Sequence, residues 1–212
     1  MRRAYLFILL SIFICNGAIA QYTPYFQNYS LSEYNAGNQN WGVSKSDEGK
    51  LYVANDKGLL EFDGIKWTLF QMPNKTTVRS VLAYDNKVYV GSYEEFGFWK
   101  KTNKGELIYE SISNLISQTK IINEEFWQIR NFKNAIIFRS FSNIYIYKEG
   151  TIKKVKTPST VISCDVVNDV LYVSTLSDGI LVLNNDELVS SIKSDELLNA
   201  KVISIIAHKK TV

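Results

Sequence analysis

Short runs of alternating apolar and polar residues, separated by glycine, asparagine or aspartate, recur along this chain. Alternation with a period of two is typical of strands that bury one face, and the separating residues tolerate the positive φ angles of tight hairpins. Four runs resemble one another, each with a turn that leads into a β-rich segment; they cover residues 49–54, 86–91, 134–139 and 168–173. The pattern therefore predicts a repeat built from strands.

Each repeat contains four strands. Aligning Tyr52, Tyr89, Ile137 and Tyr172 gives spacings of 37, 48 and 35 residues. One strand precedes each aligned run, at residues 40–44, 78–84, 126–131 and 161–166. Two strands follow it. The third strands of the repeats cover residues 59–62, 96–99, 144–147 and 180–183, and the fourth strands cover residues 66–70, 106–111, 151–155 and 187–191. Four antiparallel strands in about 40 residues make a propeller blade.

We therefore predict an all-β fold, a β-propeller of four-stranded antiparallel blades, with one helical stretch at residues 115–125. The blades cover roughly residues 40–75, 76–120, 121–158 and 159–198. Residues 199–212 begin a fifth, with 202–207 as its first strand. Because propellers close with four to eight blades, we expect a partial propeller over residues 40–212. It ends within a repeat, and its open strand edge favours aggregation.

Residues 1–20 have the features of a secretory signal peptide. Arg2 and Arg3 form a positive start, residues 4–15 are largely apolar, and Ala18-Ile19-Ala20 provides the small-x-small pattern before a cleavage site. We expect cleavage after Ala20, export to the periplasm and a lead-in segment over residues 21–39. An uncleaved membrane anchor is the alternative.

Composition and charge narrow the function classes. The chain has 212 residues, of which 46% are hydrophobic and 21% charged, so a packed core is expected. Removing the two arginines of the signal peptide leaves 22 basic residues against 21 acidic ones. A net charge near zero excludes a protein with the strongly basic surface that nucleic-acid binding requires. Cleavage also removes Cys15, and Cys164 is then expected to be a buried small hydrophobe.

Several segments resemble the two-component regulator propeller family, whose members are common in Bacteroidetes-type bacteria. The resemblance rests on Asn38-Gln39-Asn40-Trp41, residues 49–64, Val78-Arg79-Ser80-Val81, residues 89–99 and Phe126-Trp127-Gln128-Ile129. It covers residues 25–212 and implies a periplasmic sensor propeller. In that family a triple-tyrosine domain, a membrane helix and an output module follow, either a histidine kinase or a LuxR-type helix-turn-helix domain. The resemblance therefore implies an N-terminal fragment of a membrane-anchored, dimeric protein.

Signals of catalysis are weak, and we predict no enzyme, no metal site and no cofactor. The chain has a single histidine, His208, and no phosphate-binding, dinucleotide-binding or nucleophile-elbow motif. Glycosidases use a pair of carboxylates, but adjacent strand residues point to opposite faces. Glu94-Glu95 and Glu124-Glu125 are therefore interpreted as solvated loop charges.

Aromatic and arginine side chains are the better candidates for ligand binding. Loops that enter the innermost strand, or that join the second and third strands, line one mouth of a propeller channel. The candidates at these places are Arg79, Tyr93, Phe96, Trp127, Arg139 and Phe141. Aromatic faces stack on sugars, and arginine offers a planar fork to carboxylates or sulfates. The competing interpretation is packing between blades, which also applies to Trp41.

The sequence therefore favours an extracytoplasmic sensor propeller that recognises an unknown small molecule or oligosaccharide. Two alternatives stay open. A propeller enzyme of the lyase or glycosidase type requires convergent carboxylates or a metal at the channel mouth. A stand-alone protein-interaction scaffold requires a large exposed apolar patch.

Overall fold

The computed structural model describes residues 24, 26–116, 121–192, 197 and 200–208. Among these residues sixteen strands form four sheets, and each sheet contains four strands in sequential antiparallel order. Blade 1 comprises β1 (Asn40–Lys45), β2 (Leu51–Asn55), β3 (Gly58–Phe62) and β4 (Trp67–Phe70). Blade 2 comprises β5 (Val78–Tyr84), β6 (Lys87–Ser92), β7 (Phe96–Lys101) and β8 (Leu107–Ser111). Blade 3 comprises β9 (Gln128–Phe132), β10 (Ala135–Arg139), β11 (Asn143–Lys148) and β12 (Thr151–Lys156). Blade 4 comprises β13 (Val161–Val167), β14 (Val170–Thr175), β15 (Ile180–Asn184) and β16 (Glu187–Ile192).

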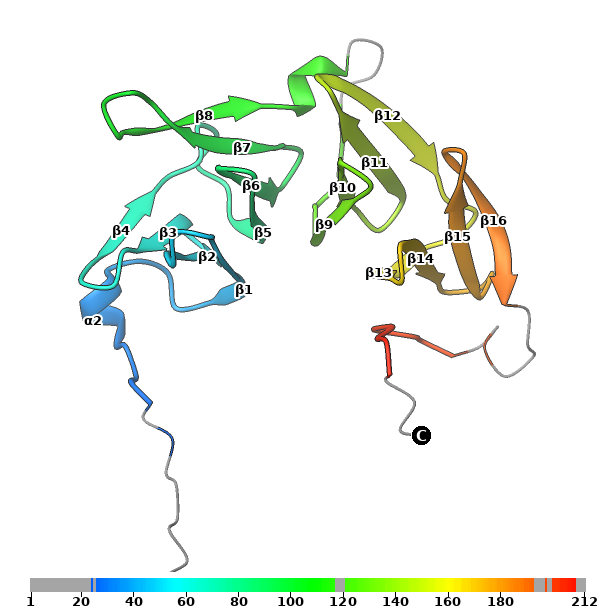
Figure 1. The fold of residues 1–212 in the computed structure, drawn as a ribbon, viewed down its shortest axis with the longest axis horizontal. Coiled ribbons are helices and arrows are strands. Elements are labelled where there is room, and N and C mark those ends of the chain that lie inside the picture. Colours follow the sequence, from blue (N-terminus) through cyan, green and yellow to red (C-terminus); the bar gives the residue numbers. More distant parts are fainter. Residues whose placement is uncertain (1–23, 25, 117–120, 193–196, 198–199, 209–212) are drawn as a thin grey trace, which may run out of the picture.

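The four blades lie side by side in an arc (Figure 1). Their first strands, β1, β5, β9 and β13, are innermost, and their fourth strands are outermost. This is the arrangement of propeller blades around an axis, and it confirms the predicted fold class.

Tight turns with positive φ angles connect the strands. Asp85-Asn86, Lys133-Asn134 and Asn168-Asp169 each place two consecutive residues at φ between 47° and 61° and join the first and second strands of blades 2, 3 and 4. Two such residues in succession are the requirement of a type I′ hairpin, which asparagine and aspartate tolerate better than most side chains. These turn residues therefore fix where the first strand ends and the second strand begins in blades 2, 3 and 4.

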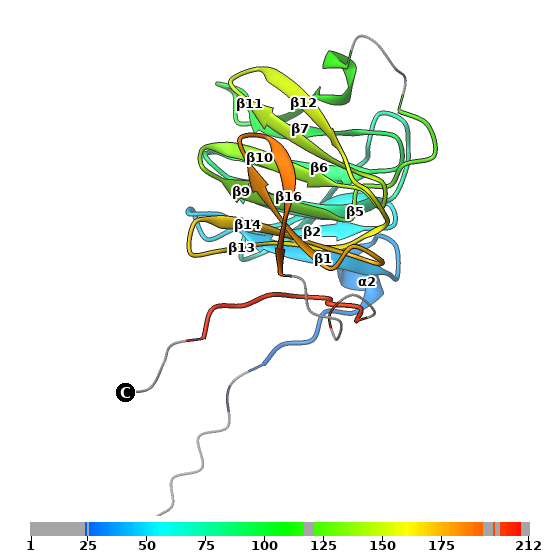
Figure 2. The same ribbon diagram turned by 90° about the vertical axis from the view of Figure 1, so that its right-hand side faces the viewer.

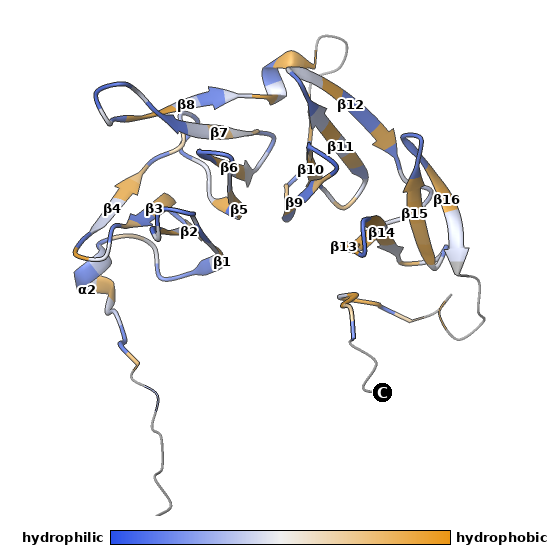
Figure 3. Ribbon diagram, viewed as in Figure 1, coloured by the Kyte–Doolittle hydropathy of each residue, from blue (hydrophilic) through white to orange (hydrophobic). Residues whose placement is uncertain are grey.

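Three hydrophobic cores hold the arc together, one between each pair of neighbouring blades. Tyr52 and Leu59 of blade 1 pack with Val78 and Val90 of blade 2. The second core is aromatic and joins blades 2 and 3, and the third joins blades 3 and 4 around Cys164. Figure 3 shows the apolar residues along the strands and hydrophilic residues at many hairpin turns.

The lead-in segment packs on the far side of blade 1, where a short helix, α2 (Leu31–Tyr34), is capped by Ser30 and Glu33. Tyr29 and Tyr34 contact the Trp67 ring edge to face. The expected signal peptide, residues 1–20, lies outside the described residues. No helix among the described residues is long and apolar enough to cross a membrane.

The predicted first strand of a fifth blade, residues 202–207, is not a strand. The described segment 200–208 is irregular and lies beyond β13, on the open side of the arc (Figure 2). It is nevertheless held there, because Ser163 Oγ donates to the Val202 carbonyl at 3.1 Å and Ile205 N–H donates to Asp165 Oδ2 at 3.1 Å. Hydrogen bonds to two side chains of β13 therefore hold this segment, in place of the backbone pairing of a strand.

The predicted helix at 115–125 is also wrong in its described part. A 3₁₀-helix, η1 (Ser113–Leu115), overlaps the predicted stretch only at Leu115. Residues 117–120 lie outside the described residues, and residues 121–125 are not helical. Glu94 N–H donates to the Glu124 carbonyl at 2.7 Å, and Glu125 forms an isolated β-bridge with Tyr93. These links between blades require an extended backbone, which outweighs the local preference for a helix.

Candidate ligand-binding site

One end of the arc gathers aromatic and charged side chains from three blades. In a sequential antiparallel sheet the first strand begins at the end where the second strand finishes and the third begins. Residues at these places in blades 1 to 3 therefore share one end of the arc, which we call the rim. Its side chains form a group that we call the rim cluster: Trp41, Arg79, Glu125, Trp127, Arg139 and Phe141.

Arg79 contacts two tryptophans of the rim cluster. Its guanidinium carbon is 4.3 Å from the ring centroid of Trp41 and 4.8 Å from that of Trp127. The two indoles also meet edge to face, with centroids 5.6 Å apart. Because the three residues come from blades 1, 2 and 3, this cation–π contact connects three blades through side chains alone.

Glu125 balances the charge of Arg79. Its Oε1 accepts from Arg79 Nη2 at 3.1 Å and from Nε at 3.3 Å. The backbone of Glu125 is fixed by its β-bridge with Tyr93, whose hydroxyl donates to Asn123 Oδ1 at 3.0 Å. The cation at the centre of the rim cluster is therefore paired and held in place.

Trp41 presents an accessible ring at the blade 1 side of the rim. Its side chain is positioned by Nε1–H, which donates to Asp56 Oδ1 at 2.9 Å, and Asp56 follows β2. Trp41 is 38% exposed. An aromatic ring that is both fixed and accessible can stack on a flat apolar ligand surface, such as a face of a sugar ring.

Phe141 presents a second accessible ring on the blade 3 side. It is 47% exposed and lies in the turn between β10 and β11. Its centroid is 5.6 Å from that of Trp127, and the guanidinium carbon of Arg139 lies 5.4 Å from it. The rim cluster thus forms a continuous set of ring and guanidinium contacts that runs from Trp41 and Arg79 through Trp127 to Phe141 and Arg139.

Arg139 differs from Arg79 in being buried and bonded only to neutral acceptors. Its Nε donates to Gln128 Oε1 at 3.1 Å, and its Nη2 donates to the Ile162 carbonyl of blade 4 at 2.6 Å. Arg139 is 5% exposed, and its buried Nη1 has no hydrogen-bond partner. Burial lowers the pKa of the guanidinium to about 10, so it stays charged at neutral pH.

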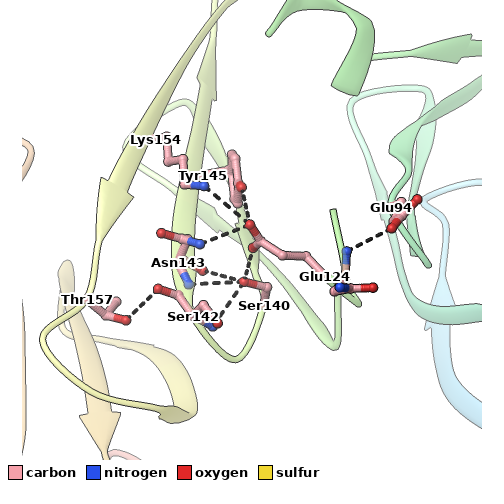
Figure 4. A network of polar contacts seen from close by, with 9 residues as sticks. Glu94, Glu124, Ser140, Ser142, Asn143, Tyr145, Lys154 and Thr157 are labelled. Carbon is pink, nitrogen blue, oxygen red and sulfur yellow. Dashed lines mark hydrogen bonds and ion pairs between the residues drawn. The ribbon is translucent and has the colours of Figure 1, made fainter. Parts of the chain in front are cut away.

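A polar network behind the rim fixes the segment that carries Glu125. The side chain of Glu124 points into blade 3, where it accepts from Ser140 Oγ at 2.5 Å, Asn143 Nδ2 at 3.0 Å, Tyr145 Oη at 2.8 Å and Lys154 Nζ at 3.3 Å (Figure 4). Burial on its own raises the pKa of Glu124. The hydrogen bonds and the charge of Lys154 nevertheless hold that pKa below its ordinary value.

The interpretation of Glu124 as a solvated loop charge is therefore wrong, since this residue is 8% exposed. Glu124 and Glu125 do point to different partners, as expected for adjacent residues of an extended segment. Glu95 is engaged as well, because it accepts from Tyr109 Oη and Ser111 Oγ, both at 2.8 Å. The Glu124 and Glu125 carboxylates thus tie the connection to blades 3 and 2, whereas Glu95 bonds within blade 2.

Phe96 requires a second correction. It is fully buried and packs against Phe126, Phe138 and Tyr145 in the core between blades 2 and 3. Packing between blades is therefore its role, and we remove it from the candidate site.

Four of the six predicted residues, Arg79, Trp127, Arg139 and Phe141, meet in the rim cluster, and Tyr93 lies beside it with an exposed ring. Prediction missed Trp41 and Glu125 as members. The signal for Trp41 was its place near the start of an innermost strand, which it shares with Trp127. Nothing in the sequence indicated that Glu125 would reach back to blade 2.

Other reactive groups give no second site in the described part of the chain. Cys164 is fully buried, as expected, and burial raises the pKa of its thiol to about 12. No group of three histidine, cysteine, aspartate or glutamate side chains is placed to hold a metal among the described residues.

Comparisons with known proteins support the fold. No protein-family model matches this chain, and no curated protein sequence does. Among solved structures it resembles the extracellular domain of the putative hybrid two component system BT4673 from B. thetaiotaomicron, with a TM-score of 0.59 and 15% identity over 84% of this chain. The extracellular domain of BT3049 from the same organism gives a TM-score of 0.56 with 16% identity over 79% of this chain.

The chain spans about a quarter of the length of these two domains, 24% in each case. It also resembles the WD40 β-propeller domain of Doa1, with a TM-score of 0.55 and 16% identity over 73% of this chain and 54% of that domain. These structural similarities establish a propeller fold. The sequence identities are too low to establish a function.

Proposed function

We propose that this chain is the ligand-recognition part of an extracytoplasmic sensor propeller from a bacterial signalling protein. The observation that carries the proposal is the rim cluster. Its two accessible rings, Trp41 and Phe141, are joined through Trp127 and Arg79 into one rigid row across three blades. A preorganised aromatic surface loses little conformational entropy when a ligand binds.

The comparisons support the same proposal at a coarser level. Two structurally similar proteins are extracellular domains of hybrid two component systems. The sequence adds the resemblance to the two-component regulator propeller family and the predicted signal peptide. We therefore assign the chain a recognition role in the periplasm, within a membrane-anchored and dimeric full-length protein, and no catalytic step.

Binding can be tested by titrating the chain with a panel of neutral and acidic mono- and oligosaccharides while recording tryptophan emission. A ligand at the rim alters the surroundings of Trp41 and Trp127, so we expect a saturable change in emission. The double variant Trp41→Ala/Phe141→Ala removes both accessible rings and should weaken binding at least about tenfold.

The matched control is Phe26→Ala, which removes an exposed ring from the lead-in segment, away from the rim. It should bind as the unmodified chain does. Equal affinities in the control and in the double variant would show that recognition, if present, does not use the rim.

Export is tested separately, by expressing the full chain in a Gram-negative host and sequencing the N-terminus of the periplasmic product. A mature chain that starts at Gln21 is expected. Retention of residues 1–20 in the membrane fraction would favour the uncleaved anchor instead.

A further inference from the structure

Arg139 stands apart from the other described arginines. Arg79 pairs with Glu125 at 3.1 Å, and Arg130 pairs with Asp165 at 3.0 Å. Arg139 is more deeply buried than either, yet among the described residues no carboxylate forms an ion pair with it. Asp165 favours its charged form from a distance but is already bonded to Arg130 and to the backbone of Ile205.

A buried guanidinium with neutral partners is an unfavourable arrangement. Transfer of a cation out of water is costly unless an opposite charge or a full set of hydrogen bonds compensates for it. Gln128 and the Ile162 carbonyl use Nε and Nη2, which leaves the buried Nη1 without an acceptor. Nearly all buried polar groups in native proteins are bonded, so an orphaned one calls for an explanation.

The neighbourhood indicates what is missing. The Nη1 group donates and cannot accept, and no acceptor among the described residues bonds to it. A partner that only accepts hydrogen bonds, and that carries negative charge, would complement the guanidinium best.

Phe141 gives this position contact with solvent. Its ring packs over the Arg139 guanidinium, contacts Trp127 on another side, and is half exposed in a turn. A ligand that approaches the guanidinium from the rim therefore meets this ring first.

We propose that Arg139 is the anchor of an oxyanion subsite at the rim, which takes the carboxylate, sulfate or phosphate group of the ligand. This inference rests on the proposed function, because it names the chemistry recognised by the same rim. The ring that bears the anionic group stacks on Phe141, and the oxygens accept from the guanidinium, so that charge and apolar contact select the ligand together.

The test is the thermal midpoint of the chain in sodium sulfate, phosphate or acetate, each compared with sodium chloride at equal ionic strength. A specific anion raises the midpoint with the logarithm of its concentration, by roughly 5–10 °C at a hundred times its dissociation constant. The variant Arg139→Gln should lose this response. Lys153→Gln, which removes an exposed cation of β12 that pairs with Asp186 outside the rim cluster, should keep it.

If Arg139→Gln does not fold, Phe141→Ala replaces it. Removing the covering ring should lower the dissociation constant obtained from the midpoint shifts at least about threefold, because the guanidinium becomes more accessible to an inorganic anion. Equal responses in the parent chain and in Arg139→Gln, or an unchanged dissociation constant in Phe141→Ala, overturn the inference. So does a parent chain that responds to sulfate, phosphate and acetate only as it does to chloride.

A further arm compares inorganic sulfate and acetate with a sulfated monosaccharide and a uronic acid. Tighter binding of the sugars shows that the anionic group arrives on a ring, and equal binding shows a free oxyanion. Both results keep the subsite.

If neutral sugars bind through Trp41 while no anion acts through Arg139, the oxyanion subsite fails and the proposed function stands. If anions act through Arg139 and no sugar uses the rim rings, the recognition role fails on its own.

Discussion

At the scale of single residues, Arg79 organises the rim cluster. Its guanidinium contacts both Trp41 and Trp127, which also contact each other, and it pairs with Glu125 from the following blade connection. The planar, delocalised cation suits both contacts, whereas the ammonium group of lysine suits neither stacking nor a two-point bond. The accessible rings therefore depend on Arg79 for their relative placement.

We expect Arg79→Ala to lower the free energy of unfolding by about 1–2 kcal/mol, because the cation–π contacts and a half-buried ion pair are lost together. Tryptophan emission should shift to longer wavelength as water reaches both indoles. Urea unfolding followed by fluorescence measures both effects. The control Lys45→Ala changes an exposed cation of β1 and should alter neither. An unshifted emission in Arg79→Ala would contradict the cation–π contacts with the two indoles.

Glu124 gives a pH dependence with a defined sign. Its pKa in the folded chain lies below the ordinary 4.5, so its contribution to stability is fully present above that value and is lost as the pH falls through the folded pKa. We expect Glu124→Gln to cost about 1–3 kcal/mol near neutral pH, because buried donors lose a charged acceptor. The difference from the parent chain should shrink below pH 4.5.

Urea unfolding at neutral pH and in acid provides the measurement for Glu124. Glu106→Gln, at an exposed turn before β8, is the matched control and should cost little at either pH. If the difference in the free energy of unfolding between the parent chain and Glu124→Gln is equally large in acid, the network does not depend on the charge of the carboxylate.

At the scale of elements, the segment 121–127 locks blade 2 to blade 3. It lies so close to β6 that a methyl group at Gly91 would come within 2.6 Å of Phe126 Cβ and 2.7 Å of its carbonyl oxygen. Ser80 Oγ, on β5, donates to the same carbonyl at 2.7 Å. Blade 2 thus leaves space for the next blade only because position 91 has no side chain.

We expect Gly91→Ala to destabilise the chain by about 1–3 kcal/mol through overpacking. Gly42→Ala is the control, since a methyl group there meets only Val81 Cγ1, at 4.0 Å, and should change stability by less than about 0.5 kcal/mol. Denaturant unfolding of both variants decides the matter. Equal midpoints would show that the two blades are less tightly joined than their contacts imply.

The elements that could be predicted from sequence are those with local causes. Paired residues such as Asp85-Asn86 and Asn168-Asp169 specify hairpins by their own backbone preferences, and alternation specifies which strand face is buried. The segment 121–125 could not be predicted, because its conformation is decided by Glu94, Tyr93 and the polar pocket of blade 3. The burial of Phe96 has the same origin, since its neighbours come from another blade.

At the scale of the whole molecule, the arc consists of four similar units joined by three cores, and each unit depends on its neighbours. Beyond the end blades the cover is partial: Tyr29 and Tyr34 of the lead-in segment pack on Trp67 of blade 1, and residues 202–205 bond to β13 of blade 4. Gly42 and Ser44 of β1 face blade 2, so Val43 between them points away, and it is 67% exposed. Beyond blade 4, Ile203 and Ile206 of the irregular segment are also exposed.

We therefore expect this chain to associate as its concentration rises, through the outward face of blade 1. Val43→Lys should reduce the association by charging that face. Ile65→Lys, which adds the same charge at an exposed turn residue after β3, should not. Sedimentation velocity over a range of concentrations checks this. A parent chain that stays monomeric throughout would remove the outward face as an association surface.

The central claim is that the rim cluster recognises the ligand. It is tested most directly by the crystal structure of the chain with any ligand that the saccharide panel retains. The account predicts a ligand at the rim, in contact with the rings of Trp41 or Phe141 and with Arg79 and Glu125 still paired. A ligand bound at the opposite end of the blades or along the outermost strands, with the rim cluster unchanged and empty, would contradict it.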